Sequence, residues 1–124
     1  MKKVLIIEDN PDIVDILTLI LEREGYTIGN LTEFTGYKNS IGVFSPDLIL
    51  LDINLGTCSG KDICKFVKAH AELKHIPVIL MSANMDLPQT KVEAGADAFL
   101  TKPFELTELT HAIRINLNNG ISLN

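Results

Sequence analysis

Short apolar runs that each end in a polar residue recur along the chain. Four of them precede candidate functional residues: Val4–Ile7 before Glu8, Leu48–Leu51 before Asp52, Val78–Met81 before Ser82, and Ala98–Thr101 before Lys102. Runs of this length, bounded by polar or turn residues, are typical of buried strands in a parallel sheet. A fifth run, Tyr26–Leu31, predicts a weaker strand because Gly29 and Asn30 interrupt it.

Helical spacing of apolar residues predicts a helix after each of these strands. The first helix begins at Asn10-Pro11, where an amide side chain can cap it and proline suits the first turn, and it ends at Gly25. The other four helices are expected over residues 34–44, 60–73, 87–94 and 105–117. Gly36 and Gly42 weaken the second helix, which we expect to be short or mobile.

Five repeats of strand and helix predict an α/β fold. Right-handed crossovers then give a doubly wound five-stranded parallel sheet with helices on both faces. The strand order 2-1-3-4-5 of flavodoxin-like folds puts the topological switch point between the first and third strands. Ligands of such sheets bind beyond the carboxyl ends of the strands, where Glu8, Asp9 and Asp52 would meet.

The residues expected at this sheet edge suit phosphoryl chemistry. One carboxylate at a strand end is usually a cap or a turn residue, but three that converge repel one another unless a cation or a proton intervenes. Mg²⁺ fits, because it binds through one or two carboxylates and keeps waters for phosphate oxygens. Asp52 would be the nucleophile that forms an acyl phosphate. Lys102, which a cis bond to Pro103 could aim, and Mg²⁺ would neutralise charge on the transferred group.

Composition narrows the classes of function. The 124-residue chain has a net charge of −5, and it has neither a basic stripe nor a block of like charge. Direct nucleic-acid binding is therefore not expected, since that needs clustered lysine or arginine. No run approaches membrane-spanning length, and the apolar run after Lys3 is too short for a signal peptide. We expect one cytoplasmic domain over residues 1–124, with Cys58 and Cys64 as reduced thiols.

Several motifs in this order resemble the receiver domain of two-component response regulators, over essentially the whole chain. The residues that carry the resemblance are Ile7-Glu8-Asp9-Asn10, Pro46-Asp47-Leu48-Ile49-Leu50-Leu51-Asp52-Ile53-Asn54, Ser82-Ala83, Ala94-Gly95-Ala96-Asp97 and Lys102-Pro103-Phe104. Each motif alone is weak, whereas this order and spacing are strongly specific. The resemblance implies a phosphorylatable switch and not an enzyme that acts on other substrates.

The resemblance also implies a role for each site residue. Asp52 would accept the phosphoryl group from a phosphohistidine on a sensor histidine kinase or a histidine phosphotransfer protein. The expected ligands of Mg²⁺ are Asp52, Asp9 directly, Glu8 through water, and Asn54 through its backbone carbonyl. Ser82 would hydrogen-bond the phosphoryl group and Lys102 would pair with it. Phe99 matches the aromatic switch position, and an unknown downstream protein would read the switched surface.

Some positions depart from the family pattern. Phe99 lacks the hydroxyl of the common tyrosine and so has less reason to point outward. Ala98 and Ala112 stand where the dimerising, DNA-binding subfamily often has charges, so we expect mainly monomers of the unphosphorylated protein. Asn54 and Asn84 are expected to flank the path of the water that hydrolyses an acyl phosphate.

Three other hypotheses stay open from the residues alone. A haloacid-dehalogenase-type phosphatase also forms an aspartyl phosphate, but it needs Asp-x-Asp after the first strand, where this chain has Glu8-Asp9-Asn10. A flavin-binding domain needs N–H donors where Glu8 and Asp9 would repel phosphate. An unphosphorylated docking module would not need an intact site. Turnover of p-nitrophenyl phosphate would favour the phosphatase, and a coloured protein the flavin domain.

Overall fold

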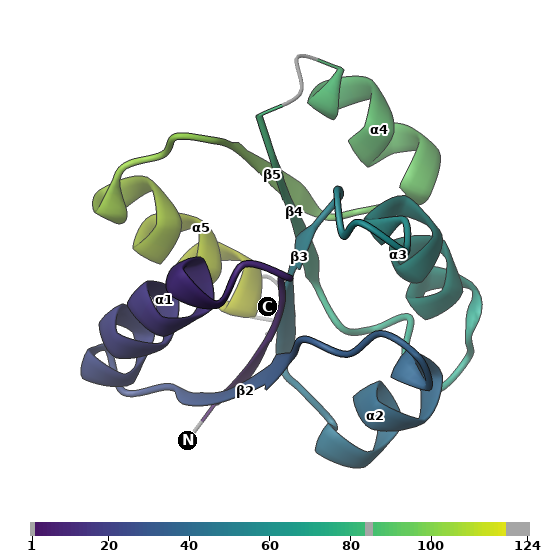
Figure 1. Cartoon of the computed structure of the whole chain (residues 1–124), viewed down its shortest axis with the longest axis horizontal. Coiled ribbons are helices and arrows are strands. Elements are labelled where there is room, and N and C mark those ends of the chain that lie inside the picture. Colours follow the sequence, from purple (N-terminus) through teal and green to yellow (C-terminus); the bar gives the residue numbers. More distant parts are fainter. Residues whose placement is uncertain (1, 84–85, 119–124) are drawn as a thin grey trace, which may run out of the picture.

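The computed structural model describes residues 2–83 and 86–118, which form five parallel strands that alternate with five helices (Figure 1). The strands are β1 (Lys3–Ile7), β2 (Thr27–Leu31), β3 (Leu48–Asp52), β4 (Val78–Ser82) and β5 (Ala98–Thr101). The helices are α1 (Pro11–Arg23), α2 (Tyr37–Phe44), α3 (Gly60–Ala69), α4 (Leu87–Ala94) and α5 (Leu106–Asn118). The strand order β2-β1-β3-β4-β5 confirms the predicted topology.

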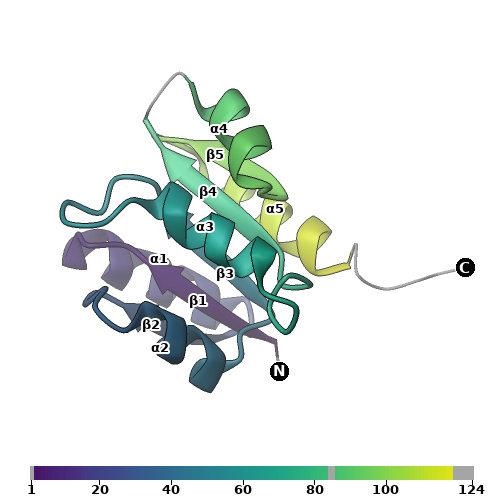
Figure 2. The ribbon, with the colours of Figure 1, turned by 90° about the vertical axis from the view of Figure 1, so that its right-hand side faces the viewer.

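Helices cover both faces of the sheet, as predicted. Figures 1 and 2 show α1 and α5 on one face and α2, α3 and α4 on the other. Every residue of β3 and β4 is buried, which explains why these strands are continuous apolar runs. The edge strand β2 is only half-buried, and its two interrupting residues stand in the ladder opposite Leu5 and Ile6 of β1.

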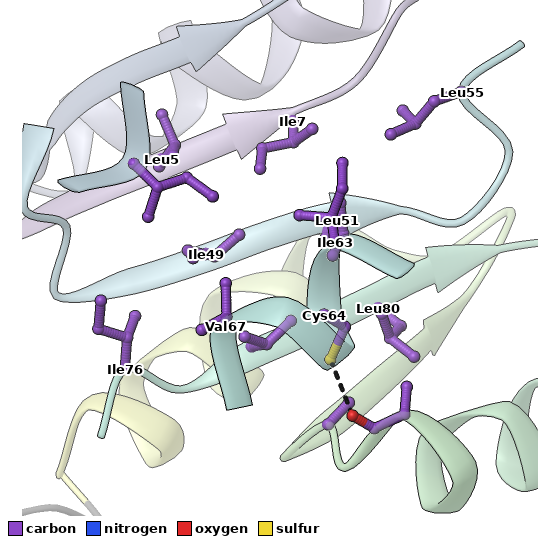
Figure 3. Packing of buried hydrophobic residues seen from close by; sticks show 14 of the residues in the cluster. Leu5, Ile7, Ile49, Leu51, Leu55, Ile63, Cys64, Val67, Ile76 and Leu80 are labelled. Atoms are coloured by element: carbon purple, nitrogen blue, oxygen red, sulfur yellow. Dashed lines mark hydrogen bonds between the residues drawn. The ribbon is translucent and has the colours of Figure 1, made fainter. Parts of the chain in front are cut away.

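Each face of the sheet has its own apolar core. On one side, residues of β1, β3 and β4 pack against α3, and Figure 3 shows Ile49 and Leu51 facing Ile63 and Val67. Leu55, from the loop after β3, joins the same cluster and is 2% exposed. On the other side, alternate residues of the same strands pack against α1 and α5. Burial of both faces fixes the strand register, and the register places the polar residues at the strand ends.

Three of the predicted helices have different boundaries in the structure. The second helix begins at Tyr37 and not at residue 34, because Gly36 adopts a left-handed conformation (φ 79°) in front of it. The third helix ends at Ala69 and not at residue 73, since His70 has an extended backbone. The last helix, expected over residues 105–117, runs one residue later at each end. The fourth helix has the predicted bounds and ends at Gly95, whose φ of 76° stops a helix.

Candidate functional site

The carboxyl ends of β1 and β3 bring three carboxylates together. The ladder pairs Ile7 with Leu51, so Glu8 and Asp52, the residues that follow them, come side by side at this edge of the sheet. Glu8, Asp9 and Asp52 each offer an oxygen, and these oxygens lie within 4.8 Å of one another. The structure thus brings together the acidic residues that the sequence placed at the switch point.

Lys102 joins two of these carboxylates. Its Nζ lies 2.9 Å from Glu8 Oε1 and 3.2 Å from Asp52 Oδ2. Glu8 is 1% exposed and Asp52 is 6% exposed, so the lysine meets two nearly buried acidic groups. The end of β5 carries Lys102 to this place: its backbone N–H donates to Ser82 O (2.8 Å), and the peptide bond to Pro103 is cis.

Burial and charge shift two pKa values in this cluster. Burial, together with the neighbouring Asp52 carboxylate, raises the pKa of Glu8 from 4.5 to about 7, although Lys102 opposes the shift. Burial lowers the pKa of Lys102, but its hydrogen bond to Glu8 and the charges of Asp52 and Glu8 outweigh this and raise it. At neutral pH the ammonium group of Lys102 therefore stays charged. The pKa of Glu8 lies close to neutral pH, so its carboxylate takes up a proton there readily.

Asp9 differs from Glu8 in exposure and in partners. The Asp9 side chain faces solvent at the start of α1, whereas Glu8 accepts hydrogen bonds from Lys102 and from the Asn10 backbone N–H (3.3 Å). The side chain of Asn10 caps the helix, as predicted, by accepting from the N–H of Asp12 at 3.0 Å. The more accessible carboxylate of the pair is thus Asp9.

The loop between β3 and α3, residues 53–59, begins with a contact to Asp52. The Asn54 backbone N–H donates to Asp52 Oδ1 at 3.0 Å, and its side chain is exposed. Leu55 anchors the loop in the core, and Asn54 forms an antiparallel bridge with Ser59. Gly60 closes this loop, since its N–H donates to Ile53 O at 2.8 Å. The sequence did not predict a role for Gly60 in the site; the one feature that could have pointed to it is its position at the start of a predicted helix.

The two expected switch residues lie on neighbouring strands. Ser82 ends β4 and is 1% exposed, and its carbonyl accepts from Lys102. Phe99, on β5, is 36% exposed, so its side chain reaches the surface although it lacks the tyrosine hydroxyl. The reason is that β5 is the edge strand, where only part of the surface is covered. Asn84 lies outside the described residues.

An apolar hollow adjoins the lysine. It has a volume of about 560 Å³ and is bordered by residues of α1 and of the segment after β5. Its lining is Ile13, Ile16, Leu17, Ala83, Lys102, Pro103 and Phe104. Ile16 is 59% exposed, so a partner that approaches the carboxylates would meet apolar surface there. Within the described ranges, the helices are too short or too polar for any of them to cross a membrane.

Comparison with known proteins identifies relatives of this chain. The family model described as the response regulator receiver domain matches residues 4–114. The sensory transduction protein RegX3 of Mycobacterium tuberculosis is 35% identical over 123 residues, which is 97% of this chain and 52% of RegX3. The DNA-binding response regulator MtrA of Mycolicibacterium smegmatis is 28% identical over 121 residues, 96% of this chain and 52% of MtrA. The chain therefore spans about half the length of these curated relatives.

A solved structure shares the fold. The receiver domain of the sensor histidine kinase PA1611 from Pseudomonas aeruginosa PAO1, with a magnesium ion coordinated in its active-site cleft, superposes with a TM-score of 0.84. It is 24% identical, and the match covers 94% of this chain and 98% of that one.

Proposed function

The chain belongs to the response regulator receiver family, and from this premise we propose that Asp52 is its phosphoacceptor. As a receiver domain of two-component systems, it is a signalling module and not a classical enzyme. The family assignment favours the switch hypothesis over the phosphatase and flavin hypotheses. The observation that carries the residue assignment is the contact of Lys102 with both Glu8 and Asp52.

Asp52 is the carboxylate best prepared for attack. Its Oδ1 accepts from the Asn54 backbone N–H and its Oδ2 from Lys102, so the group is held in one orientation. Attack by an oxygen of Asp52 on phosphorus forms a P–O bond and breaks the P–N bond of a phosphohistidine. The imidazole leaves and takes up a proton. Lys102 offsets negative charge on the transferred group, and Ser82, at the end of β4, donates a hydrogen bond to it.

The residues present fit a divalent cation. Three carboxylates within 4.8 Å of one another leave a surplus of negative charge that one lysine does not balance. This all-oxygen donor set, completed by the Asn54 carbonyl, is of the kind that Mg²⁺ prefers. A bound Mg²⁺ would supply positive charge next to the transferred phosphoryl group. Asp9 would hold it directly, and Glu8 through water.

The donor is a sensor histidine kinase or a histidine phosphotransfer protein. The apolar hollow beside Lys102 supports a protein donor, because it extends the site with surface that a small phosphate ester would not need. Phe99 is the proposed switch residue, because it is exposed on the edge strand β5, next to the strand β4 that ends at Ser82. A downstream protein, and not nucleic acid, contacts the switched surface of this domain.

Residues 1–124 make up one receiver domain, which is cytoplasmic and monomeric before phosphorylation. Two core layers around a single sheet support the assignment of one domain. Light scattering of the unphosphorylated protein at micromolar concentration should give the monomer mass. A tight dimer would contradict this.

The largest expected effect comes from the acceptor itself. Incubation with acetyl phosphate and Mg²⁺ should add one phosphoryl group by intact mass spectrometry, and Asp52→Asn should abolish the addition, since an amide is not a comparable nucleophile. Asp47→Asn is the matched control: Asp47 lies at the other end of β3, where its carboxylate binds the Lys3 N–H at 2.7 Å. Equal labelling of Asp52→Asn and wild type would refute the assignment.

Metal affinity should separate the two carboxylates that follow β1. Asp9→Ala should weaken Mg²⁺ binding more than Glu8→Ala does, because Asp9 is exposed and Glu8 is occupied by Lys102. Isothermal titration calorimetry at pH 8 would measure both affinities, with Asp12→Ala, in the first turn of α1, as an acidic control. The opposite ranking would mean that the two roles are reversed.

A further inference from the structure

The first residue of α3 lies against the backbone of the acceptor strand. A Cβ added to Gly60 would be 2.1 Å from the carbonyl oxygen of Asp52 and 2.9 Å from its carbonyl carbon. It would also be 2.7 Å from the Cα of Ile53. Real Cβ contacts are essentially never shorter than 3.0 Å, so no residue with a side chain fits without a shift of the main chain.

Gly60 differs in this respect from the other glycines in the described part of the chain. A Cβ at Gly42, inside α2, would meet nothing within 4 Å, and one at Gly29 would meet the ring of Phe44. Only at Gly60 are the closest atoms all backbone atoms, which cannot rotate away as a side chain can. The contact therefore constrains the end of β3 directly.

Hydrogen bonds connect this contact to the Asp52 carboxylate. The Gly60 N–H donates to Ile53 O at 2.8 Å, and the Ile53 N–H donates to Met81 O at 3.1 Å. One residue further on, the Asn54 N–H donates to Asp52 Oδ1 at 3.0 Å. A displacement of residues 52–54 would thus move the carboxylate and the Asn54 carbonyl together.

We propose that Gly60 is a positioning residue for phosphoryl transfer: it lets α3 seat on the Asp52–Ile53 backbone and so fixes the acceptor carboxylate. This inference rests on the proposed role of Asp52. An alanine at position 60 has to push the two main-chain segments apart by about 1 Å to reach an acceptable contact. Misplacement of a reacting group by this amount lowers a rate by up to about 100-fold.

The test compares Gly60→Ala with Gly42→Ala, a glycine at a helical position with open space around it. Phosphorylation by acetyl phosphate is followed at saturating Mg²⁺, with circular dichroism to confirm that each protein is folded. Trimethylamine N-oxide is added to all samples if Gly60→Ala is partly unfolded. We expect Gly60→Ala to be phosphorylated about 10- to 100-fold more slowly than wild type, and Gly42→Ala at the wild-type rate.

An NMR measurement reports the geometry independently of phosphorylation. The amide signals of Ile53 and Asn54 should shift in Gly60→Ala and not in Gly42→Ala. A folded Gly60→Ala protein with the wild-type rate and unshifted signals would overturn the proposal. A protein that stays unfolded in the osmolyte would also overturn it, because the contact would then serve the fold as a whole. If wild type and Gly42→Ala take up no phosphoryl group either, the proposed function of Asp52 fails, and the NMR result still decides whether Gly60 positions it.

Discussion

Two lysine–glutamate pairs of similar geometry behave in opposite ways in this protein. In the site, Lys102 Nζ lies 2.9 Å from Glu8, which is 1% exposed. On the surface, Lys61 Nζ of α3 lies 2.5 Å from Glu93 of α4, whose side chain is 44% exposed. The pKa of Glu8 is raised to about 7, whereas the hydrogen bond from Lys61 lowers the pKa of Glu93. The environment of the carboxylate, and not the presence of a lysine, decides whether its pKa is raised or lowered.

The physical reason is the cost of removing a charge from water. Burial penalises the ionised form of Glu8, and Asp52 competes for the same lysine. Glu93 keeps its hydration and gains a second hydrogen bond, from Gln89 at 3.2 Å. Glu8 therefore meets its lysine in a place where burial penalises the carboxylate charge, whereas the surface pair is an ordinary link between two helices.

Removal of the lysine that contacts two buried carboxylates should have the largest effect on stability. Lys102→Met leaves Glu8 and Asp52 without their cation, and we expect the metal-free protein at pH 8 to lose about 3 kcal/mol of unfolding free energy. Urea unfolding in EDTA would measure the loss. Lys61→Met is the matched control, and its urea midpoint should stay near that of wild type. If Lys102→Met and Lys61→Met lost equal unfolding free energy, the proposed difference between the two lysine–glutamate pairs would be wrong.

The pH dependence of the unfolding free energy should report the raised pKa of Glu8. Its pKa is about 7 in the folded protein and 4.5 ordinarily, so the folded state binds more protons between these values. Unfolding free energy should therefore fall as pH rises from 4.5 to 7, by at most about 3 kcal/mol, and change no further above pH 7. Lys102 does not add to this change, because its raised pKa keeps it charged throughout.

The measurement is urea unfolding of metal-free wild type and Glu8→Gln at pH 5 and pH 8. Other carboxylates titrate in both proteins, so the difference between the two profiles reports Glu8. We expect wild type to lose stability relative to Glu8→Gln as pH rises. Parallel profiles would show that the carboxyl group titrates normally in the folded protein.

The surface pair should give the smallest effect. Glu93→Gln keeps the shape of the side chain and removes its charge. Water then solvates the Lys61 ammonium in place of the lost ion pair. The urea midpoint and the phosphorylation rate should both be unchanged within error, with or without Mg²⁺. A clear loss of stability in this variant would mean that the link between α3 and α4 matters more than its exposure implies.

Much of the fold followed from local patterns. The buried strands β3 and β4 are continuous apolar runs, and parallel strands joined by helices allow few topologies, so the order and the two helical layers were predicted correctly. The boundaries of α2 and α3 were not, because they depend on the backbone conformations of Gly36 and His70. Neither residue type specifies its conformation without the surrounding contacts.

For the site, the sequence by itself determined which side chains meet. Strand ends and the switch point suffice to bring Glu8, Asp52 and Lys102 to one edge, because parallel strands end on the same side of a sheet. Only the tertiary structure decided the surroundings of these side chains: Glu8 is buried and Asp9 exposed, and Gly60 lies against the backbone of Asp52. Burial and close contact depend on how helices pack across the sheet, which no local pattern of residues records.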